Sequence, residues 1–145
     1  MRAAIAERRE AVIVLATGAS QFETMAVLTA APGITWDRGT RFHLDEYIGF
    51  PADHPASFRG YQRQCFLETL GGRARLHEID GEAANSETGA ARLSALMAGR
   101  TVDVCFAGLG ENCHPASNDP PASAARPGPP PLGRCRHARR PGGRP

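Results

Sequence analysis

The chain has 145 residues, which is enough for one domain with its own hydrophobic core. All 17 basic residues are arginines, and six of them lie in residues 120–145, where there is no Asp or Glu. The first 119 residues therefore carry 11 arginines against all 15 acids, a formal charge of −4, so the basic balance of the whole chain does not indicate a nucleic-acid-binding domain.

Apolar runs and helical patterns alternate along the first 110 residues. The runs predict strands at 11–15, 40–45, 75–79 and 101–110. The helical patterns between them predict helices at 20–30, 56–70 and 86–99. Ser20 and Glu23 have the spacing of a capping box, and Ser86 is the predicted N-cap of the last helix. This alternation is typical of an α/β fold with three layers, in which helices cover both faces of a mostly parallel, Rossmann-like sheet.

The composition changes after residue 119. Residues 120–145 contain eight prolines and few large apolar side chains, so we expect no helix or strand there. The predicted organisation is a domain at 1–119 and a disordered Pro/Arg/Gly-rich tail at 120–145. The arginines of the tail could contact nucleic acid or acidic partners, but a solvated disordered end is the favoured interpretation, and no nucleic-acid partner is expected.

The four cysteines, at positions 65, 105, 113 and 135, have no dense or regular spacing. No segment has the pattern of a targeting signal or approaches the roughly 18 apolar residues of a membrane span, so we expect a cytoplasmic protein with reduced thiols and no membrane partner. Cys113-His114 and Cys135-x-His137 contain zinc-binding residue types, but their spacing does not suit a zinc knuckle, and no metal is expected.

Polar clusters follow three of the predicted strands, and ligands of parallel α/β sheets bind beyond the carboxyl ends of the strands. The clusters are Thr17-Gly18-Ala19-Ser20, Asp45-Glu46 and Gly110-Glu111-Asn112-Cys113-His114. The first cluster runs from a strand into a helix, an arrangement that favours an anion such as phosphate, although an ordinary strand–helix turn has the same pattern.

The other two clusters contain groups that can move protons. Asp45 and Glu46 should point in different directions, because side chains alternate along an extended chain. One of them could be a general base that removes a proton from carbon; the alternative is a pair of solvated acids that closes a strand. His114 could shuttle a proton with help from Asp119, or it could be an incidental imidazole in a polar loop.

Four stretches resemble successive motifs of one enzyme family. They are "LATGAS" (15–20), "FHLDEYIGFPADHPASF" (42–58), "IDGEA" (79–83) and "GLGENCH" followed by "SNDPP" (108–121). Over about residues 5–120 the chain is similar to the glucosamine-6-phosphate deaminase/isomerase family, which is related to 6-phosphogluconolactonase. The second motif favours the deaminase branch. The resemblance implies an α/β fold of the type also found in ribose-5-phosphate isomerase and CoA transferases, and no cofactor.

The resemblance also implies catalytic roles. Asp45 matches the base that takes the C2 proton during aldose–ketose interconversion. His114 matches the histidine that assists opening of the sugar ring, and Asn112 and Asp119 match its supporting neighbours. The implied activity converts glucosamine 6-phosphate to fructose 6-phosphate and ammonia.

The implied ligand is a small-molecule sugar phosphate. Gly18, Ala19 and Ser20 match the loop that helps to hold it, Thr17 belongs to the same cluster, and Glu46 is expected to support the site from the other face. Related enzymes are often oligomeric, so a homo-oligomer is compatible with the resemblance.

The resemblance stops after Asp119, whereas members of the family continue for about as many residues again. We therefore expect a truncated family member that is incomplete at its C-terminus, marginally stable and of doubtful activity. The alternatives are an inactive remnant that binds sugar phosphates weakly, a 6-phosphogluconolactonase-like hydrolase, and a small interaction protein that uses its tail.

Overall fold

A run of five buried apolar residues, β1 (Ala11–Leu15), forms the centre of a parallel sheet. It pairs with β2 (Gly39–His43) on one side and with β5 (Val104–Phe106) on the other, and β2 pairs in turn with β4 (Arg75–His77). The computed structural model describes residues 1–109 and 135–137. The mostly parallel sheet predicted from the alternating pattern is confirmed.

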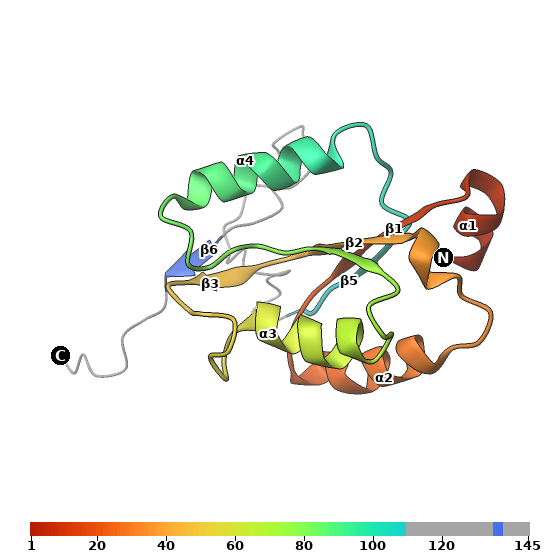
Figure 1. Ribbon diagram of the computed structural model, residues 1–145, viewed down its shortest axis with the longest axis horizontal. Coiled ribbons are helices and arrows are strands. Elements are labelled where there is room, and N and C mark those ends of the chain that lie inside the picture. The colour runs from red at the N-terminus through yellow and green to blue at the C-terminus, as the bar shows by residue number, and fades with distance from the viewer. Residues whose placement is uncertain (110–134, 138–145) are drawn as a thin grey trace.

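Helices cover both faces of this sheet. α2 (Phe22–Ala30) and α3 (Phe58–Gln62) lie on one face, and α4 (Ser86–Met97) lies on the other (Figure 1). The other helical elements are α1 (Arg2–Arg8), the single turns η1 (Ala19–Gln21) and η2 (Trp36–Arg38), and the π-helical turn η3 (Arg63–Glu68), which continues α3. The predicted three-layer α/β fold is therefore confirmed.

The alternation of side chains along β1 creates two cores, one on each face of the sheet. Ile13 and Leu15 point toward α2 and η3, where they join a cluster with Met25, Trp36, Phe66, Leu70 and Ala74. Val12 and Val14 point toward α4, where they pack with Phe42, Ile79 and Leu93. Because both faces of β1 are covered, its sequence is continuously apolar rather than alternating.

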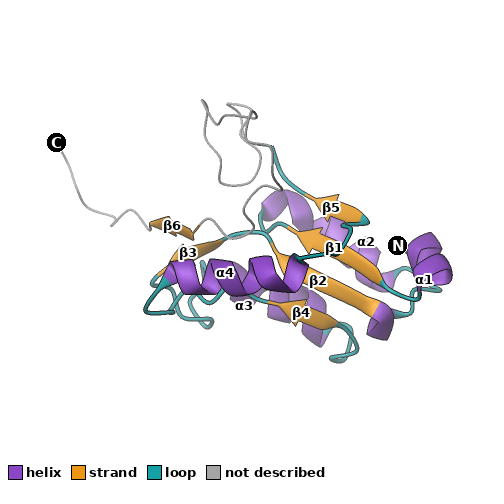
Figure 2. Cartoon of the chain, turned by 90° about the horizontal axis from the view of Figure 1, so that it is seen from above, coloured by secondary structure: helices purple, strands orange, loops and turns teal. Residues whose placement is uncertain are grey.

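The order of the strands places a topological switch point beside β1. The chain passes from β1 outward to β2 and β4 and then returns to the other side of β1 as β5, as Figure 2 shows from above. In open α/β sheets the crevice that binds ligands lies at such a point, beyond the carboxyl ends of the two strands, here β1 and β5. The loops that follow β1 and β5 are therefore the expected walls of a ligand site.

A second, two-stranded sheet lies beyond β2. β3 (Glu46–Ile48) pairs in parallel with β6 (Cys135–His137), next to each other in Figure 1. The expectation that residues 120–145 contain no strand is wrong for these three residues. Pairing of a short strand requires only backbone N–H and C=O groups on a free edge, which a Pro/Arg/Gly-rich composition does not exclude.

Several predicted boundaries and caps are wrong. The strand predicted at 40–45 ends at His43, the strand predicted at 101–110 covers only 104–106, and α1 was not predicted. Ser20 lies within η1 rather than at an N-cap, so the predicted capping box does not form. α4 is capped by Asn85 instead of Ser86, because the Asn85 Oδ1 atom accepts hydrogen bonds from the backbone N–H groups of Glu87 (2.8 Å) and Thr88 (3.3 Å).

Gly60 in α3 is a position where only glycine fits. A Cβ atom there would lie 2.2 Å from the carbonyl oxygen of Ala52. We expect Gly60→Ala to lower the free energy of unfolding by about 1–3 kcal/mol, because the loop at 51–53 must move away. Urea unfolding followed by circular dichroism measures this change.

Gly89, the fourth residue of α4, is the matched control, since a Cβ atom there meets nothing within 4 Å. Gly89→Ala should raise the free energy of unfolding by about 0.5–1 kcal/mol, as expected for a helix interior. The same gain for Gly60→Ala would show that the close contact with Ala52 does not exist in solution.

Candidate active site

Three chain segments leave the sheet side by side at the carboxyl ends of β1, β2 and β5. The Ala16 N–H group donates to the Phe106 carbonyl oxygen (2.9 Å), and the Leu44 N–H group donates to the Leu15 carbonyl oxygen (3.1 Å). These bonds continue the ladders beyond the ends of the strands. The loop after β1, the residues after β2 and the loop after β5 therefore begin at one edge of the sheet.

The loop Thr17–Ser20 lies at the switch point between β1 and β5. Thr17 and Gly18 are half-buried, whereas Ala19 and Ser20 are exposed. The Ser20 Oγ atom would lie 4.0 Å from a Cβ atom placed on Gly108, so the loops after β1 and β5 face each other. A Cβ atom on Gly18 meets nothing within 4 Å, which leaves open space beside the loop backbone. This is the position in which an α/β sheet can hold an anion against the start of a helix.

Asp45 lies where β2 has ended and β3 has not yet begun. Its side chain is 8% exposed, so the carboxylate is close to the edge of the sheet without being freely solvated. The structure thus brings Asp45 and the loop Thr17–Ser20 to the same edge, as the sequence predicted. His114, Asn112 and Asp119 lie outside the described residues, and their predicted roles remain predictions.

Glu46 contacts the start of α3 and caps this helix. The side chain is 1% exposed, and its carboxylate accepts four hydrogen bonds. The donors are the backbone N–H groups of Tyr47 (2.8 Å), Phe58 (3.0 Å) and Arg59 (2.6 Å) and the Ser57 hydroxyl group (2.9 Å). Because a carboxylate offers about four acceptor positions, these contacts favour a structural role for Glu46 over direct binding of a substrate.

The motif "IDGEA" holds the outer side of α3. The guanidinium group of Arg59 is buried and pairs with Asp80 (2.7 Å) and Glu82 (2.7 Å). Gly81 lies so close to β3 that a Cβ atom there would be 2.5 Å from the Tyr47 carbonyl oxygen. This motif therefore supports the segment around Asp45 from outside, a role that the sequence did not reveal.

Gln62 is a site residue that the sequence analysis missed. Its side chain is 1% exposed, and its Nε2 atom donates to the Ala16 carbonyl oxygen (3.1 Å) and to the Thr17 Oγ1 atom (3.1 Å). Gln62 lies four residues before the buried Phe66 on the same helical stripe. A glutamine on an otherwise apolar stripe is the signal that could have identified it.

Two ionisable residues are buried on β2 beneath α3 and η3. Among the described residues, neither the Arg41 guanidinium group nor the His43 ring has a hydrogen-bond partner. Burial lowers the pKa of Arg41 to about 9, and its guanidinium carbon lies 4.1 Å from the centre of the Phe66 ring. Burial lowers the pKa of His43 to about 4; nearby Glu78 raises it and Arg59 lowers it further. His43 is therefore neutral at pH 7.

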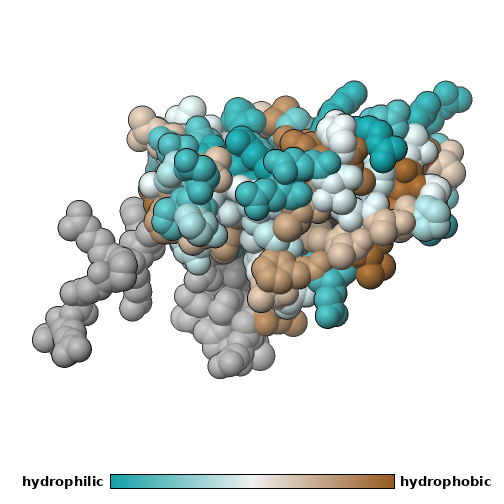
Figure 3. Space-filling view, turned by 60° about the horizontal axis from the view of Figure 1, so that its bottom comes forward, coloured by the Kyte–Doolittle hydropathy of each residue, from teal (hydrophilic) through white to brown (hydrophobic). Residues whose placement is uncertain are grey.

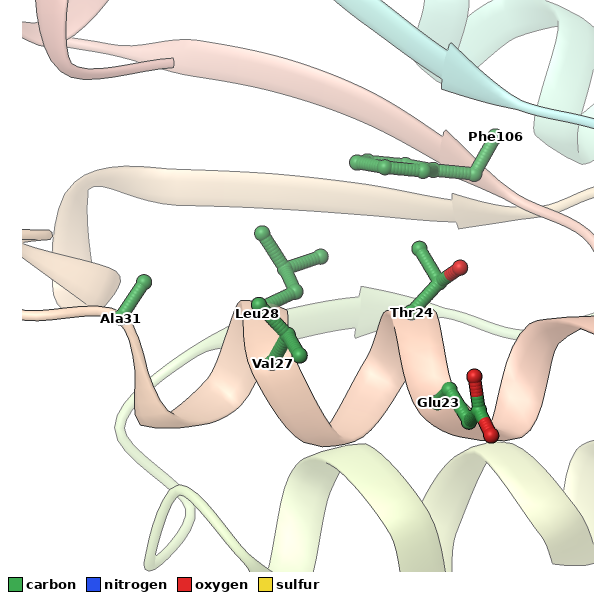
Figure 4. A pocket seen from close by; sticks show the side chains of 6 residues that line it. All are labelled: Glu23, Thr24, Val27, Leu28, Ala31 and Phe106. Carbon is green, nitrogen blue, oxygen red and sulfur yellow. The ribbon is translucent and has the colours of Figure 1, made fainter.

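A separate groove of about 440 Å³ lies between α2 and β5. Phe106 of β5 lies opposite Thr24 and Leu28 of α2 (Figure 4). Hydrophobic residues also reach the surface on this side of the molecule (Figure 3), where Val27 of α2 is 72% exposed. The groove is lined by Glu23, Thr24, Val27, Leu28, Ala31 and Phe106, none of which belongs to the candidate site.

The described part of the chain contains no group of three His, Cys, Asp or Glu side chains that could hold a metal ion. None of the helices in that part is long and apolar enough to cross a membrane.

The sequence matches a family model for glucosamine-6-phosphate isomerases and 6-phosphogluconolactonase over residues 1–128. A glucosamine-6-phosphate deaminase of Pseudarthrobacter chlorophenolicus is 34% identical over 120 residues, which are 80% of this chain and 46% of that protein. The deaminase of Rhodopirellula baltica is 33% identical over 82% of this chain and 49% of its own length. The chain thus spans about half the length of the curated relatives it matches.

Two solved structures also share the fold of this chain. The chain resembles a monomeric glucosamine-6-phosphate deaminase with a TM-score of 0.72 and 27% identity, over 84% of this chain and 53% of that one. A 6-phosphogluconolactonase from Shewanella baltica, 23% identical over 80% of this chain and 50% of its own, shares the fold with a TM-score of 0.70.

The cap formed by Glu46 can be tested by replacing the carboxylate with an amide. In Glu46→Gln, one acceptor oxygen becomes an NH₂ group that faces N–H and O–H donors, so we expect the free energy of unfolding to fall by about 2–4 kcal/mol. Chemical denaturation measures the change. Glu68→Gln, at an exposed position near the end of η3, is the control and should have no effect; equal stability of both variants would contradict the assigned cap.

The lowered pKa of the buried His43 ring predicts that the protein loses stability at acid pH. The unfolded chain binds a proton on His43 below about pH 6.5, whereas the folded chain does so only near pH 4, so the unfolded state is favoured increasingly as the pH falls between these values. Over this pH range the free energy of unfolding falls by an amount on the order of 3 kcal/mol. In His43→Leu this part of the pH dependence should disappear from the free energy of unfolding, whereas His54→Leu, in an exposed loop, should retain it. An unchanged pH profile in His43→Leu would refute the assignment.

Proposed function

Because the chain belongs to the family of glucosamine-6-phosphate isomerases and 6-phosphogluconolactonases, we propose that it acts on a hexose 6-phosphate. The proposed reaction converts glucosamine 6-phosphate and water to fructose 6-phosphate and ammonia. Two relatives that are 34% and 33% identical are glucosamine-6-phosphate deaminases, which favours this reaction. The residues that the chain shares with them correspond to about half of each relative, so the activity of the whole protein is part of the proposal.

The observation that carries the proposal is the position of Asp45. Its buried carboxylate lies at the end of β2, at the same edge of the sheet as the loop Thr17–Ser20. An enolisation requires a base that is held close to a carbon atom, and a phosphate group several bonds away needs its own binding loop. The two segments supply these two functions from one rigid edge.

In the proposed reaction, Asp45 takes the proton from C2 of the open-chain amino sugar. The electron pair of the C2–H bond forms a double bond between C1 and C2, while the electrons of the C1 carbonyl double bond move to its oxygen, which takes up a proton. Return of a proton to C1 and loss of a proton from the nitrogen then leave a hydroxyl group at C1 and an imine at C2. Addition of water to this imine and loss of ammonia give the ketose. A carboxylate that is fixed by its neighbours, rather than by the substrate, loses no free energy to reorientation in this step.

The remaining roles follow the resemblance in sequence. His114 is proposed to move the proton that opens the sugar ring, with Asn112 and Asp119 orienting it. The loop Thr17–Ser20 is proposed to hold the phosphate with its N–H groups and hydroxyl groups at the start of the helical segment η1–α2. The proposed ligand is thus a small sugar phosphate, no cofactor is required, and a homo-oligomer in the cytoplasm is compatible with the proposal.

Hydrolysis of 6-phosphogluconolactone is the second candidate function. It is supported by the family model, which covers both activities, and the same loop would hold the phosphate. This reaction has no step at C2 that needs Asp45 as a carbon base. Release of acid from the lactone, followed on the same preparation, therefore distinguishes the two candidates.

The proposed base is tested by Asp45→Asn. The amide cannot accept the C2 proton, so formation of ammonia and fructose 6-phosphate from glucosamine 6-phosphate should fall by roughly 10²–10⁴-fold. The matched control is Asp53→Asn, because Asp53 is an exposed acid in the same motif. It should leave the rate unchanged.

If Asp45→Asn converts the substrate at the rate of the unsubstituted protein, Asp45 is not the base that takes the C2 proton. If the unsubstituted protein binds glucosamine 6-phosphate without converting it, the chain is a sugar-phosphate binder rather than a deaminase.

A further inference from the structure

We infer that Gln62 is a positioning residue, which holds the loop Thr17–Ser20 at a fixed place relative to the corner of the chain that carries Asp45. This inference rests on the proposed function, because it assigns the loop to the phosphate of the substrate. Gln62 itself is buried and touches the loop only through Ala16 and Thr17. It acts through these residues rather than on the substrate.

The first part of the argument is the attachment of α3 at its N-terminal end. The Glu46 carboxylate accepts hydrogen bonds from the backbone N–H groups of Phe58 and Arg59, the first two residues of α3. Glu46 is the neighbour of Asp45 in the chain. The start of α3 therefore cannot move relative to Asp45 without breaking hydrogen bonds to a buried carboxylate.

The second part is the attachment at the other end of the same helix. Gln62 is the last residue of α3, and it is one turn, about 6 Å, along the axis from Phe58. Its Nε2 atom donates to the Ala16 carbonyl oxygen and the Thr17 Oγ1 atom, both at 3.1 Å. One rigid helical turn thus connects the Asp45–Glu46 corner with the first residues of the loop.

The direction of these hydrogen bonds matters for the loop. The Thr17 oxygen accepts from Gln62, so the hydroxyl proton of Thr17 is free to be donated elsewhere. Thr17 is half-buried at the edge of the sheet, with Gly18 and the exposed Ser20 next to it in the loop. Gln62 therefore presents the Thr17 hydroxyl group as a donor, which is the polarity that a phosphate oxygen requires.

A purely structural role for Gln62 makes a different prediction. Gln62→Met removes the buried Oε1 atom, which has no hydrogen-bond partner among the described residues, but it also removes the donor to the Ala16 carbonyl oxygen and the Thr17 Oγ1 atom, so the free energy of unfolding can change in either direction. If Gln62 has only a structural role, Gln62→Met should bind ligands as well as the unsubstituted protein does. If Gln62 positions the loop, the affinity for phosphate must fall even when stability does not.

The experiment measures the dissociation constants of inorganic phosphate and of glucosamine 6-phosphate by isothermal titration calorimetry. We expect Gln62→Met to weaken both by about fivefold, which corresponds to about 1 kcal/mol, the contribution of one hydrogen bond. In turnover, KM for glucosamine 6-phosphate should rise while kcat changes little. Gln64→Met, at an exposed position two residues further on, is the matched control and should behave like the unsubstituted protein.

A double-mutant cycle with Thr17→Val tests the path of the effect. Thr17→Val removes the hydroxyl group and should itself weaken phosphate binding. Adding Gln62→Met to Thr17→Val should then cause little further loss, because Gln62→Met acts by releasing the hydroxyl group that Thr17→Val has already removed. Additive losses would show that Gln62 does not act through Thr17, and phosphate binding by Gln62→Met with unchanged affinity would overturn the inference.

These outcomes are separate from failure of the proposed function. If the protein binds phosphate with the dependence on Gln62 described above but does not convert glucosamine 6-phosphate, the proposed reaction is wrong and the positioning role stands. If the unsubstituted protein does not bind phosphate at all, the loop is not a phosphate site and the positioning role is wrong as well.

Discussion

The buried carboxylate of Glu46 is the constraint on which the geometry of the candidate site depends. It has no cationic partner among the described residues, so it is stabilised by the hydrogen bonds that it accepts from Tyr47, Ser57, Phe58 and Arg59. These donors lie on both sides of the turn between β3 and α3. The chain must therefore turn back after β3, and the hydrogen bonds to Glu46 fix the start of β3, which directly follows Asp45 at the edge of the sheet.

The parallel sheet supplies the second half of the site. Because β1 lies between β2 and β5, the segments that follow all three strands meet at one edge. The loop after β1 faces the loop after β5, and Asp45 follows β2 on the other side. No local preference of these segments for one another is required, since the strand order alone brings them together.

Three polar side chains are buried next to the apolar core on the α3 side of the sheet. Arg41, His43 and Gln62 are buried on the α3 side of the sheet, and each has at least one polar atom without a hydrogen-bond partner among the described residues. Such groups lower the stability of a fold. Natural proteins tolerate local costs of this kind mainly next to functional sites. Gln62 is such a case, because its amide group contacts Ala16 and Thr17 at the start of the proposed phosphate loop.

The sequence by itself determined the features that depend on neighbouring residues: the apolar run of β1, the alternation of strands and helices, and the polar clusters at Thr17–Ser20 and at Asp45, directly after the strands. Only the tertiary structure decided how Glu46 and Gln62 are used and that β3 pairs with β6. The physical reason is distance along the chain. Gln62 is 45 residues from Thr17, and β6 is far from β3, so no local pattern contains both partners of these contacts.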